Sequence, residues 1–189
     1  MPSLEKDDLK NIDADNLFEN FPTFVETGTY LCETIKKMEP LFKTLHTIEI
    51  KQEFYLKANV NYKSDKINFH FGDSSKKLKS VCELLKTDTL FFLDGHWSAG
   101  NTGRGEKDCP LYEELENIVK YCQYNCIIIV DDVRLFGKGP NNGNEVCNWE
   151  NISVKNILNI VNNRLTKHYF IDSKLDRKDR LILHLNKFF

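Results

Sequence analysis

Short apolar runs that end in acidic residues are the feature that most restricts how this chain can fold. Such runs occur at residues 24–25, 91–93 and 127–130. The acids that follow them are Glu26, Asp94, Asp131 and Asp132. A carboxylate beside a buried strand is costly unless it has a partner, and in open α/β sheets ligands bind outside the carboxyl ends of the strands. The pattern therefore indicates a cofactor site beside a site for a hard metal ion.

Turn residues divide the chain into alternating strand and helix patterns. We expect strands at residues 23–26, 44–50, 67–71, 89–94, 126–132, 168–172 and 180–185. We expect helices at residues 31–41, 51–60, 74–85, 110–121 and 153–161, and a short amphipathic helix or a lid in residues 1–20. This alternation predicts an α/β fold, a doubly wound and mostly parallel seven-stranded sheet with helices on both faces. The last two strands form a closing pair, so the C-terminal strand is expected to be antiparallel.

Length and composition limit the class of protein. The 189 residues favour one domain, spanning residues 1–189, with room for a full core. Hydrophobic residues make up 41% and charged residues 29%, a balance typical of a globular protein. The net charge of -2 gives no electrostatic case for a nucleic-acid or membrane partner. No apolar run approaches the roughly 20 residues that a membrane span needs.

Six cysteines are spread along the chain without a CxxC pair. The first residues do not have the pattern of a secretory signal, so we expect reduced thiols and a cytoplasmic location. The cysteines and histidines also lack the spacing of zinc ligands, which argues against a zinc site.

A glycine turn, with Gly28 at its centre, joins the first expected strand to the first expected helix. Glycine lets the backbone approach a ligand closely, and the helix N-terminus that follows favours electronegative groups. A single glycine at such a place is also common as a plain turn. Glu49 strengthens the ligand interpretation, because an acid roughly 20 residues later, at the end of the next strand, can accept both hydroxyls of a ribose. The alternative for Glu49 is a solvated acid at a strand end.

Gly72, Asp73 and Ser74 end the third expected strand at the same edge of the sheet. Asp73 can accept a hydrogen bond from an adenine amino group, and Ser74 suits the N-cap of the following helix. A turn followed by a helix cap, without any ligand, explains these residues equally well.

Asp94, Asp131 and Asp132 form a stronger group. They follow the fourth and fifth strands, which lie side by side in a sheet of this kind, so their carboxylates can converge. Such carboxylates repel one another unless a cation lies between them. Ligation by oxygen alone suits Mg²⁺, Mn²⁺ or Ca²⁺ rather than zinc. In the alternative interpretation, Asp131 caps the loop and Asp132 is solvated.

His96 lies two residues after Asp94, on a loop that should face the same cleft. Histidine titrates near neutral pH, so His96 could take a proton from a substrate hydroxyl. It could instead be a fourth metal ligand or a packed loop residue. Trp97 is either a platform for a substrate or part of the core.

Over nearly its full length, the chain resembles the class I S-adenosylmethionine-dependent methyltransferases. Residues 26–30 resemble the glycine-rich first motif of that family, and Glu49 resembles its ribose-binding acid. The sequence Asp94-Gly95-His96-Trp97, together with Asp131-Asp132, resembles the metal-dependent sugar O-methyltransferases of macrolide and aminocoumarin biosynthesis. In those enzymes the first aspartate and the aspartate pair hold Mg²⁺, and an acid two residues after the first aspartate is the base.

The resemblance implies a Rossmann-like fold and an O-methyltransferase that uses S-adenosylmethionine and Mg²⁺ or Mn²⁺. The implied catalytic residues are Asp94 and His96, and the implied metal ligands are Asp94, Asp131 and Asp132. The implied cofactor-binding residues are Glu26, Thr27, Gly28, Thr29, Tyr30, Glu49, Asp73, Ser74 and Asp94. The acceptor would be a small hydroxylated molecule such as a sugar or glycan. The apolar C-terminus, Phe188-Phe189, could contact a second copy of the chain in a homo-oligomer.

Two positions depart from the family pattern. His96 stands at the base position in place of an acid, which keeps base chemistry but changes its pH dependence. Cys32 stands where the family usually has a second glycine, so its side chain is expected to crowd the methionine portion of the cofactor. Cys32 thereby supports a rival interpretation, a non-catalytic binding protein on a methyltransferase scaffold. A second rival is a metal-dependent hydrolase that uses the aspartate and histidine cluster.

Overall fold

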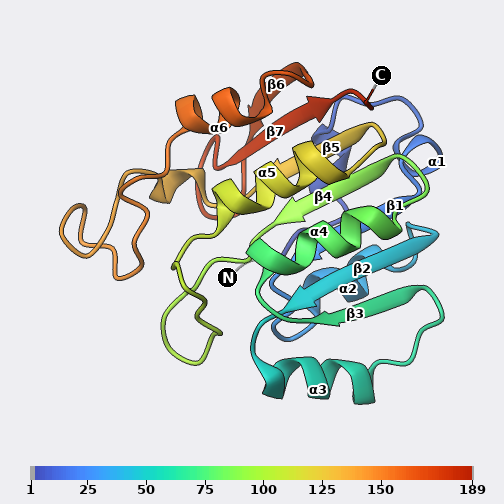
Figure 1. Cartoon of the computed structure of the whole chain (residues 1–189), viewed down its shortest axis with the longest axis horizontal. Coiled ribbons are helices and arrows are strands. Elements are labelled where there is room, and N and C mark those ends of the chain that lie inside the picture. The colour runs from blue at the N-terminus through green and yellow to red at the C-terminus, as the bar shows by residue number, and fades with distance from the viewer. Residues whose placement is uncertain (1–2, 189) are drawn as a thin grey trace.

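The strands of this protein form one sheet with the order β3-β2-β1-β4-β5-β7-β6. The structure is a computed structural model that describes residues 3–188, and Figure 1 shows the strands from β6 at the top to β3 at the bottom. The strands are β1 (Thr23–Thr27), β2 (Thr44–Glu49), β3 (Ile67–Phe71), β4 (Thr89–Leu93), β5 (Cys126–Val130), β6 (Leu165–Ile171) and β7 (Arg180–Leu185). The α-helices are α1 (Leu17–Asn20), α2 (Glu33–Met38), α3 (Gln52–Asn61), α4 (Ser74–Leu84), α5 (Leu111–Tyr121) and α6 (Val154–Val161). Two short 3-10 helices, η1 (Asp8–Asn11) and η2 (Val133–Leu135), complete the set.

The strand pairings confirm the predicted Rossmann-like sheet. β1 pairs in parallel with β2 and with β4, β2 pairs in parallel with β3, and β4 pairs in parallel with β5. β7 lies between β5 and β6 and runs antiparallel to both, as predicted for the C-terminal strand. The chain first builds outward from β1 through β2 and β3, and then returns to the other side of β1 with β4. Such a reversal of strand order is where α/β sheets open a crevice for a ligand.

Strand register brings the ends of three central strands to one level. Leu93 at the end of β4 is paired with Thr27 of β1 on one side and with Val130 of β5 on the other. The residues that follow these strand ends are Gly28, Asp94 and Asp131. In Figure 1 the long loops after β4 and β5 project from the same side of the molecule, at the left.

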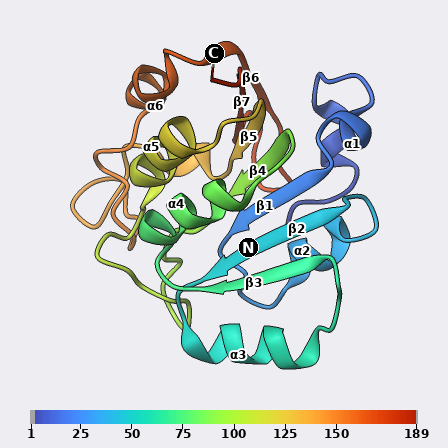
Figure 2. The ribbon, with the colours of Figure 1, turned by 45° about the vertical axis from the view of Figure 1, so that its right-hand side comes forward.

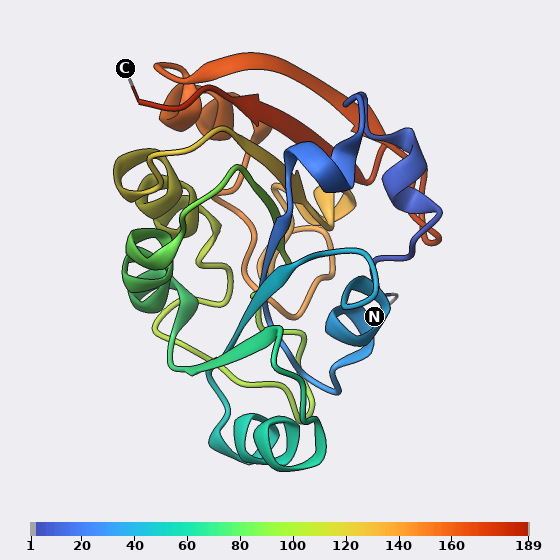
Figure 3. The ribbon, with the colours of Figure 1, turned by 90° about the vertical axis from the view of Figure 1, so that its right-hand side faces the viewer.

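Helices cover both faces of the sheet, as Figures 2 and 3 show. α4, α5 and α6 pack on one face, where their apolar residues join a first core cluster with side chains of β1, β4 and β5. α2 and the N-terminal segment pack on the other face in a second core cluster. α3 lies along the β3 edge of the sheet (Figure 2). β1, β4 and β5 are buried at every position, as expected for central strands of a parallel sheet.

For the N-terminal segment we predicted a short amphipathic helix or a lid, and the structure shows two separate elements, η1 and one turn of α-helix, α1. Asn16 has a left-handed backbone with a φ of 46°, which prevents a longer helix through this position. The apolar residues of the segment are nevertheless buried in the second core cluster: Leu4, Leu9, Ile12 and Leu17. Met1, Pro2 and Phe189, which belong to the predicted terminal features, lie outside the described residues.

Several element boundaries also differ from the prediction, and so does one helix cap. α2 begins at Glu33 rather than at residue 31, because Cys32 adopts a left-handed backbone with a φ of 63°. β6 begins at residue 165 rather than 168, and its position at the edge of the sheet leaves it half exposed, which weakens its apolar pattern. Asp73, rather than Ser74, is the N-cap of α4 and accepts a hydrogen bond from the backbone of Ser75.

All six cysteines carry free thiols in buried positions. They therefore act as small hydrophobic residues of the core. Among the helices of the described residues, none is both long enough and apolar enough to cross a membrane.

The buried side chain of Arg164 joins the end of α5 to the end of the sheet. Its guanidinium nitrogens donate hydrogen bonds of 2.6–3.1 Å to backbone carbonyl oxygens. The acceptors belong to Ile118, Val119, Cys122, Tyr124 and Asn186. The last carbonyls of a helix have no partner within the helix, and a positive charge is favourable at that end. Arg164 therefore supplies hydrogen-bond donors to the carbonyl groups at the C-terminal end of α5.

We expect Arg164→Met to lower the free energy of unfolding by about 3 kcal/mol or more, because several buried carbonyls lose their donors at once. Chemical denaturation followed by circular dichroism measures the change. Arg177→Met, at an exposed position in the turn between β6 and β7, is the control and should leave stability unchanged. Equal stability of the wild type and Arg164→Met would show that these carbonyls find other partners.

Candidate cofactor and metal site

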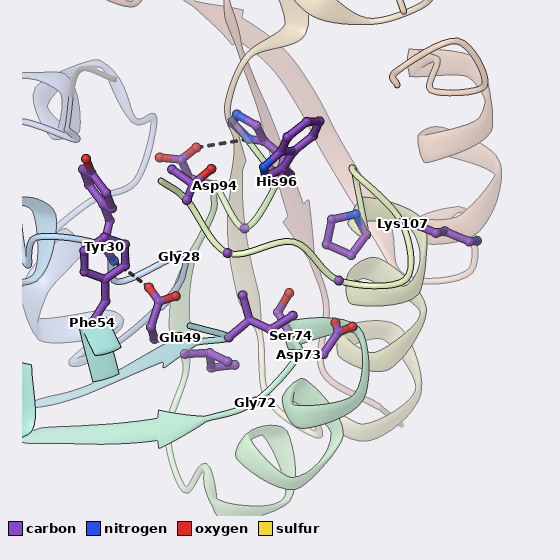
Figure 4. Close-up of a pocket in the computed structure, with 18 residues that line it drawn as sticks. Gly28, Tyr30, Glu49, Phe54, Gly72, Asp73, Ser74, Asp94, His96 and Lys107 are labelled. Carbon is purple, nitrogen blue, oxygen red and sulfur yellow. Dashed lines mark hydrogen bonds and ion pairs between the residues drawn. The ribbon is translucent and has the colours of Figure 1, made fainter. Parts of the chain in front are cut away.

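A cleft opens at the carboxyl ends of β1 to β4, beneath the loop that follows β4. It spans about 590 Å³, a figure that includes the open solvent at its mouth. Six of the predicted cofactor-binding residues line it: Gly28, Tyr30, Glu49, Asp73, Ser74 and Asp94. Figure 4 shows Glu49 and Asp73 on one side of the cleft, with Asp94 and His96 on the opposite side.

Gly28 allows two segments of the chain to approach closely. It has a left-handed φ of +86°, and a Cβ atom added to it would lie 2.6 Å from the main-chain oxygen of Asp94. Its N–H donates to the carbonyl of Ile48 at 2.9 Å, which fixes the turn against β2. The turn after β1 therefore lies directly against the loop after β4, and a side chain at position 28 would push the two apart.

Glu49 presents a buried carboxylate whose orientation is fixed by main-chain amides. Its Oε2 accepts a hydrogen bond from Tyr30 N at 2.8 Å, drawn in Figure 4, and its Oε1 accepts one from Lys51 N at 2.7 Å. Burial raises the pKa of Glu49, and these amide hydrogen bonds act in the opposite direction. A carboxylate held in this way can accept two further hydrogen bonds from neighbouring hydroxyl groups.

Asp73 ends β3 and caps α4. Its Oδ1 accepts hydrogen bonds from Ser75 N at 2.9 Å and from Ser75 Oγ at 2.6 Å. Its Oδ2 faces the loop after β4, since a Cβ atom added to Gly105 would lie 2.8 Å from it. The cap uses Oδ1, so Oδ2 remains able to accept a hydrogen bond from a ligand.

Three of the predicted cofactor-binding residues, Glu26, Thr27 and Thr29, lie beneath the cleft rather than in its wall. Glu26 is 1% exposed and accepts a hydrogen bond from Thr47 Oγ1 at 2.7 Å. The hydroxyls of Thr29 and Thr47 lie 2.5 Å apart, and Thr27 Oγ1 accepts from Asp94 N at 3.2 Å. Burial raises the pKa of Glu26 to about 8, so this acid carries a proton at neutral pH.

Cys32 is not part of the cleft wall. Its left-handed backbone directs the side chain into the second core cluster, where it is buried. Cys32 lines a neighbouring hollow instead, which shares Tyr30 and Phe54 with the cleft.

Asp94, His96 and Asp132 lie together at the end of the cleft. His96 Nδ1 is 3.3 Å from Asp94 Oδ1, and His96 Nε2 is 3.1 Å from Asp132 Oδ2. Ser98 Oγ lies 2.9 Å from the same Nε2, and the imidazole packs on Trp149 with 4.7 Å between ring centroids. Burial lowers the pKa of His96, against the opposing effect of the Asp132 charge. The imidazole is therefore neutral near pH 7.

Asp131, predicted to be a metal ligand together with Asp94 and Asp132, belongs to a different group. Its Oδ1 accepts a hydrogen bond from Arg180 Nε at 2.9 Å. Arg180 Nη1 lies 2.6 Å from Asp8 Oδ2, in the N-terminal segment. Burial raises the pKa of Asp131 to about 6, and Arg180 acts in the opposite direction. The carboxylate of Asp131 is thus already paired with a fully buried cation.

A second ion-pair group, with two buried aspartates and a partly buried arginine, lies beside the first. Arg134 contacts Asp132 Oδ1 and lies 2.7 Å from Asp179 Oδ2. Asp179 also accepts hydrogen bonds from Arg134 N at 3.0 Å and from Ser173 Oγ at 2.6 Å. Arg134 therefore neutralises one oxygen of Asp132, while the other oxygen faces His96.

The unsatisfied carboxylate oxygens around Asp94, His96 and Asp132 suit a positive charge. Among the described residues, Asp94 Oδ1 and Asp132 Oδ2 are buried acceptors without a well-formed hydrogen bond, and the candidate ligand atoms lie within 4.8 Å of one another. Burial, followed by the charges of Asp131 and Asp132, raises the pKa of Asp94 well above its usual range. A proton on Asp94 or a divalent cation would satisfy these oxygens. The donor set therefore fits a hard divalent cation.

Glu114 of α5 is a buried acid of the site that we did not predict. A Cβ atom added to Gly95 would lie 2.7 Å from Glu114 Oε1, so the acid lies directly below the loop after β4. Burial raises its pKa to about 7, while Ser74 and Thr27 act in the opposite direction. Its position next to Leu115, on the apolar face of an amphipathic helix, was the available signal, because an acid is costly there.

A second hollow adjoins the cleft, between the loops that follow β4 and β5. The two share Trp97 and Lys107. The walls of the second hollow combine aromatic rings, amides and charged groups, among them Trp97, Arg104, Tyr112, Glu113, Asn148 and Asn151. Its charges have partners, since Arg104 Nε lies 2.7 Å from Asp108 Oδ1, Lys107 contacts Glu113, and Glu106 pairs with Lys76 of α4. The walls are therefore polar but nearly neutral.

No protein-family model and no curated protein matches the sequence. Solved structures do match. A candidate caffeoyl-CoA O-methyltransferase from Staphylococcus aureus has a TM-score of 0.59 and 13% identity, with 98% of this chain and 85% of that chain covered. A candidate S-adenosylmethionine-dependent methyltransferase from Listeria monocytogenes has a TM-score of 0.55 and 11% identity, with 97% of each chain covered. The N-methyltransferase NodS from Bradyrhizobium japonicum, in complex with S-adenosyl-L-homocysteine, has a TM-score of 0.54 and 13% identity, with 90% and 81% covered.

The buried Glu26 predicts a specific pH dependence of stability. Its pKa is about 8 in the folded protein against 4.5 for an unperturbed glutamate, so the folded protein keeps a proton that the unfolded chain releases. The stability that this proton supplies is complete below about pH 4.5 and is lost as the pH rises through about pH 8. Glu26→Gln has no proton to release there, so it should gain about 3–5 kcal/mol relative to the wild type across this range.

Urea denaturation of both proteins at a series of pH values measures this difference. The comparison of wild type with variant cancels the effects of the other titrating groups, provided that these groups keep their surroundings. A difference that stays constant between about pH 5 and about pH 8.5 would contradict a raised pKa of Glu26.

Proposed function

We propose that this chain, which has the fold of the class I S-adenosylmethionine-dependent methyltransferases, uses S-adenosylmethionine to methylate a hydroxyl group. A fold alone does not establish a function. The observation that carries the proposal is the Glu49 carboxylate, which two main-chain amides fix at the end of β2 in the wall of the cleft. An acid in this place has a specific use, because it can accept both ribose hydroxyls of a nucleoside cofactor.

The other residues of the cleft fit further parts of the same cofactor. Asp73 Oδ2 and Ser74 would take the adenine end, beside Ile50. Gly28 would let the sulfonium-bearing part pass close to the turn after β1. Glu26, which is protonated in the free protein, would ionise when the positively charged cofactor binds above it.

The reaction would be a single displacement. S-adenosylmethionine would supply the methyl group: the acceptor oxygen would bond to the methyl carbon as the carbon–sulfur bond breaks, and the electron pair of that bond would stay on sulfur. His96 would take the proton of the acceptor hydroxyl, because its neutral imidazole lies in the wall of the cleft. Asp132, 3.1 Å from Nε2, would stabilise the imidazolium that forms. Most of the rate would come from holding oxygen and methyl carbon in line at about 3–3.5 Å.

We also propose a divalent cation, Mg²⁺ or Mn²⁺, between Asp94 and Asp132. The support is the pair of buried oxygens, Asp94 Oδ1 and Asp132 Oδ2, that face the same space beside His96. A cation bound there would attract the acceptor oxygen and lower its pKa. Asp131 is left out of this ligand set, because it is paired with Arg180. The proposed ligands therefore differ from the predicted ones at this position.

The acceptor would bind in the second hollow, between the loops that follow β4 and β5. Trp97 and Lys107 border both hollows, so a molecule bound there could place a hydroxyl group at His96. Aromatic and amide groups with paired charges suit a neutral hydroxylated molecule, such as a sugar or the end of a glycan.

Binding of S-adenosylhomocysteine tests the cofactor part of the proposal. Calorimetric titration should give micromolar binding to the wild type. Glu49→Gln should weaken it at least about tenfold, because an amide is a weaker acceptor than a carboxylate for the ribose hydroxyls. Glu53→Gln, an exposed acid at the start of α3 outside the cleft, is the control and should bind like the wild type. No binding by the wild type would reject the methyltransferase proposal and favour the metal-dependent hydrolase.

Binding of Mn²⁺ to the protein alone tests the metal part and needs no acceptor. Calorimetry should show one site in the wild type and at least about a thirtyfold loss of affinity in Asp132→Asn, since a carboxylate ligand is removed. Asp65→Asn, at an exposed position, controls for the change of net charge. His96→Gln should keep the wild-type affinity within about threefold if His96 acts only as the base. Equal Mn²⁺ binding by the wild type and Asp132→Asn would reject the assigned site.

A further inference from the structure

Part of the loop that follows β4 lies directly over the end of the cleft where the adenosine of the proposed cofactor would bind. Residues 98–107, here called the roof loop, cover Ile50 and Asp73, which follow β2 and β3. The residues of the roof loop that line the cleft are Thr102, Gly103, Gly105 and Lys107. In Figure 4 the chain between His96 and Lys107 crosses the cleft, with Asp94 on one side and Asp73 on the other.

Close contact explains the glycines at positions 103 and 105. Neither has a left-handed backbone, so other residues could adopt the same conformation. A Cβ atom added to Gly103 would clash with Ile50 Cγ2 and would lie 3.2 Å from the main-chain nitrogen of Lys51. A Cβ atom added to Gly105 would lie 2.8 Å from Asp73 Oδ2. The two glycines therefore let the main chain of the roof loop rest on the residues that would surround an adenine ring.

Two lysines connect the roof loop to the elements that carry Glu49 and Asp73. Lys51, two residues after Glu49, donates from Nζ to the carbonyl of Asn101 at 2.5 Å and also contacts the Asn101 side chain. Lys76 of α4 forms an ion pair with Glu106. Both contacts are exposed to solvent, where each is worth little. They can therefore hold the roof loop down and still break readily.

The roof loop also forms a wall of the second hollow. Its Arg104 lies over the ring of Trp97, 4.1 Å from the ring centroid, and both side chains line that hollow. Trp97 borders the cleft as well. A movement of the roof loop would therefore change the cleft and the second hollow together.

We propose that the roof loop is part of the cofactor site and closes over the adenosine end of S-adenosylmethionine, with Gly103 and Gly105 as the positions that allow closure. This inference rests on the proposed function. The roof loop must open to admit the nucleoside, because its main chain already lies against Ile50 and Asp73. Because Arg104 of the roof loop lies over Trp97 in the wall of the second hollow, an open roof loop leaves that hollow incomplete, so the cofactor binds before the acceptor.

S-adenosylhomocysteine is the probe for this proposal, with two readouts that do not depend on activity. Tryptic cleavage after Arg104 reports whether the roof loop is closed, and the dissociation rate of the ligand reports how long it stays closed. The ligand should slow cleavage at Arg104 of the wild type at least about tenfold. Gly103→Ala should raise the dissociation rate at least about tenfold, because the added methyl group holds the roof loop away from Ile50.

Lys51→Met provides a second variant, which removes the contact to Asn101 and leaves the main chain of the roof loop unaltered. It should raise the dissociation rate about three- to tenfold, and it keeps the proposal testable if Gly103→Ala folds poorly. Gly137→Asn is the glycine control, because a Cβ atom there meets nothing within 4 Å and asparagine tolerates its positive φ. Lys57→Met, an exposed lysine of α3 outside the cleft, is the lysine control.

The outcomes separate the inference from the proposed function. If the wild type binds S-adenosylhomocysteine, but cleavage at Arg104 is not slowed and the variants release the ligand at the wild-type rate, the roof loop is not part of the site. The proposed function would stand in that case. If the wild type does not bind the ligand at all, the proposed function fails and the closing roof loop fails with it.

Discussion

The concentration of buried acids at one edge of the sheet is the constraint on which the rest of this structure depends. Burying an anion is costly, and this edge offsets the cost in two ways. Some of the acids are paired with arginines, the partly buried Arg134 or the fully buried Arg180: these are Asp131, Asp132 and Asp179. Others have a pKa that burial raises, which favours their protonated form: these are Glu26, Asp94 and Glu114. The cleft can therefore hold many carboxyl groups without carrying all of their charges.

The arginine pairs also explain why segments far from the cleft belong to its support. Arg180 is the first residue of β7, the antiparallel strand, and it reaches Asp131 after β5. The same side chain contacts Asp8 of the N-terminal segment, which covers the opposite face of the sheet from α4 and α5. A single buried guanidinium thus connects the chain's beginning and end with the edge that faces the ligand. Loss of the N-terminal segment would leave Arg180 with one partner and weaken the hold on Asp131.

The sequence predicted this fold well because its signals are local. Apolar runs gave the strands, and the acid at the end of each run gave the edge where the cleft opens. Ion pairs between distant residues have no local sequence signal. Asp131 and Arg180 are 49 residues apart, and the sequence of β7 does not show which acid its first residue, an arginine, will pair with. The direction of Cys32 depends on a left-handed φ of 63° that its residue type does not indicate. Glu114 was the exception, because its place on an apolar helix face could be read from the sequence.

The two tryptophans of the chain have an unusual distribution, since both lie at this site. Trp97 borders both hollows with the Arg104 guanidinium over its ring, whereas Trp149 is buried and packs on the His96 imidazole. Tryptophan fluorescence therefore reports on this one region. The rest of the molecule contributes only tyrosine fluorescence. A partly exposed indole and a buried one also differ in emission wavelength and in access to a dissolved quencher. Intrinsic tryptophan fluorescence can thus distinguish events in the cleft from changes around the His96 imidazole, without an attached dye.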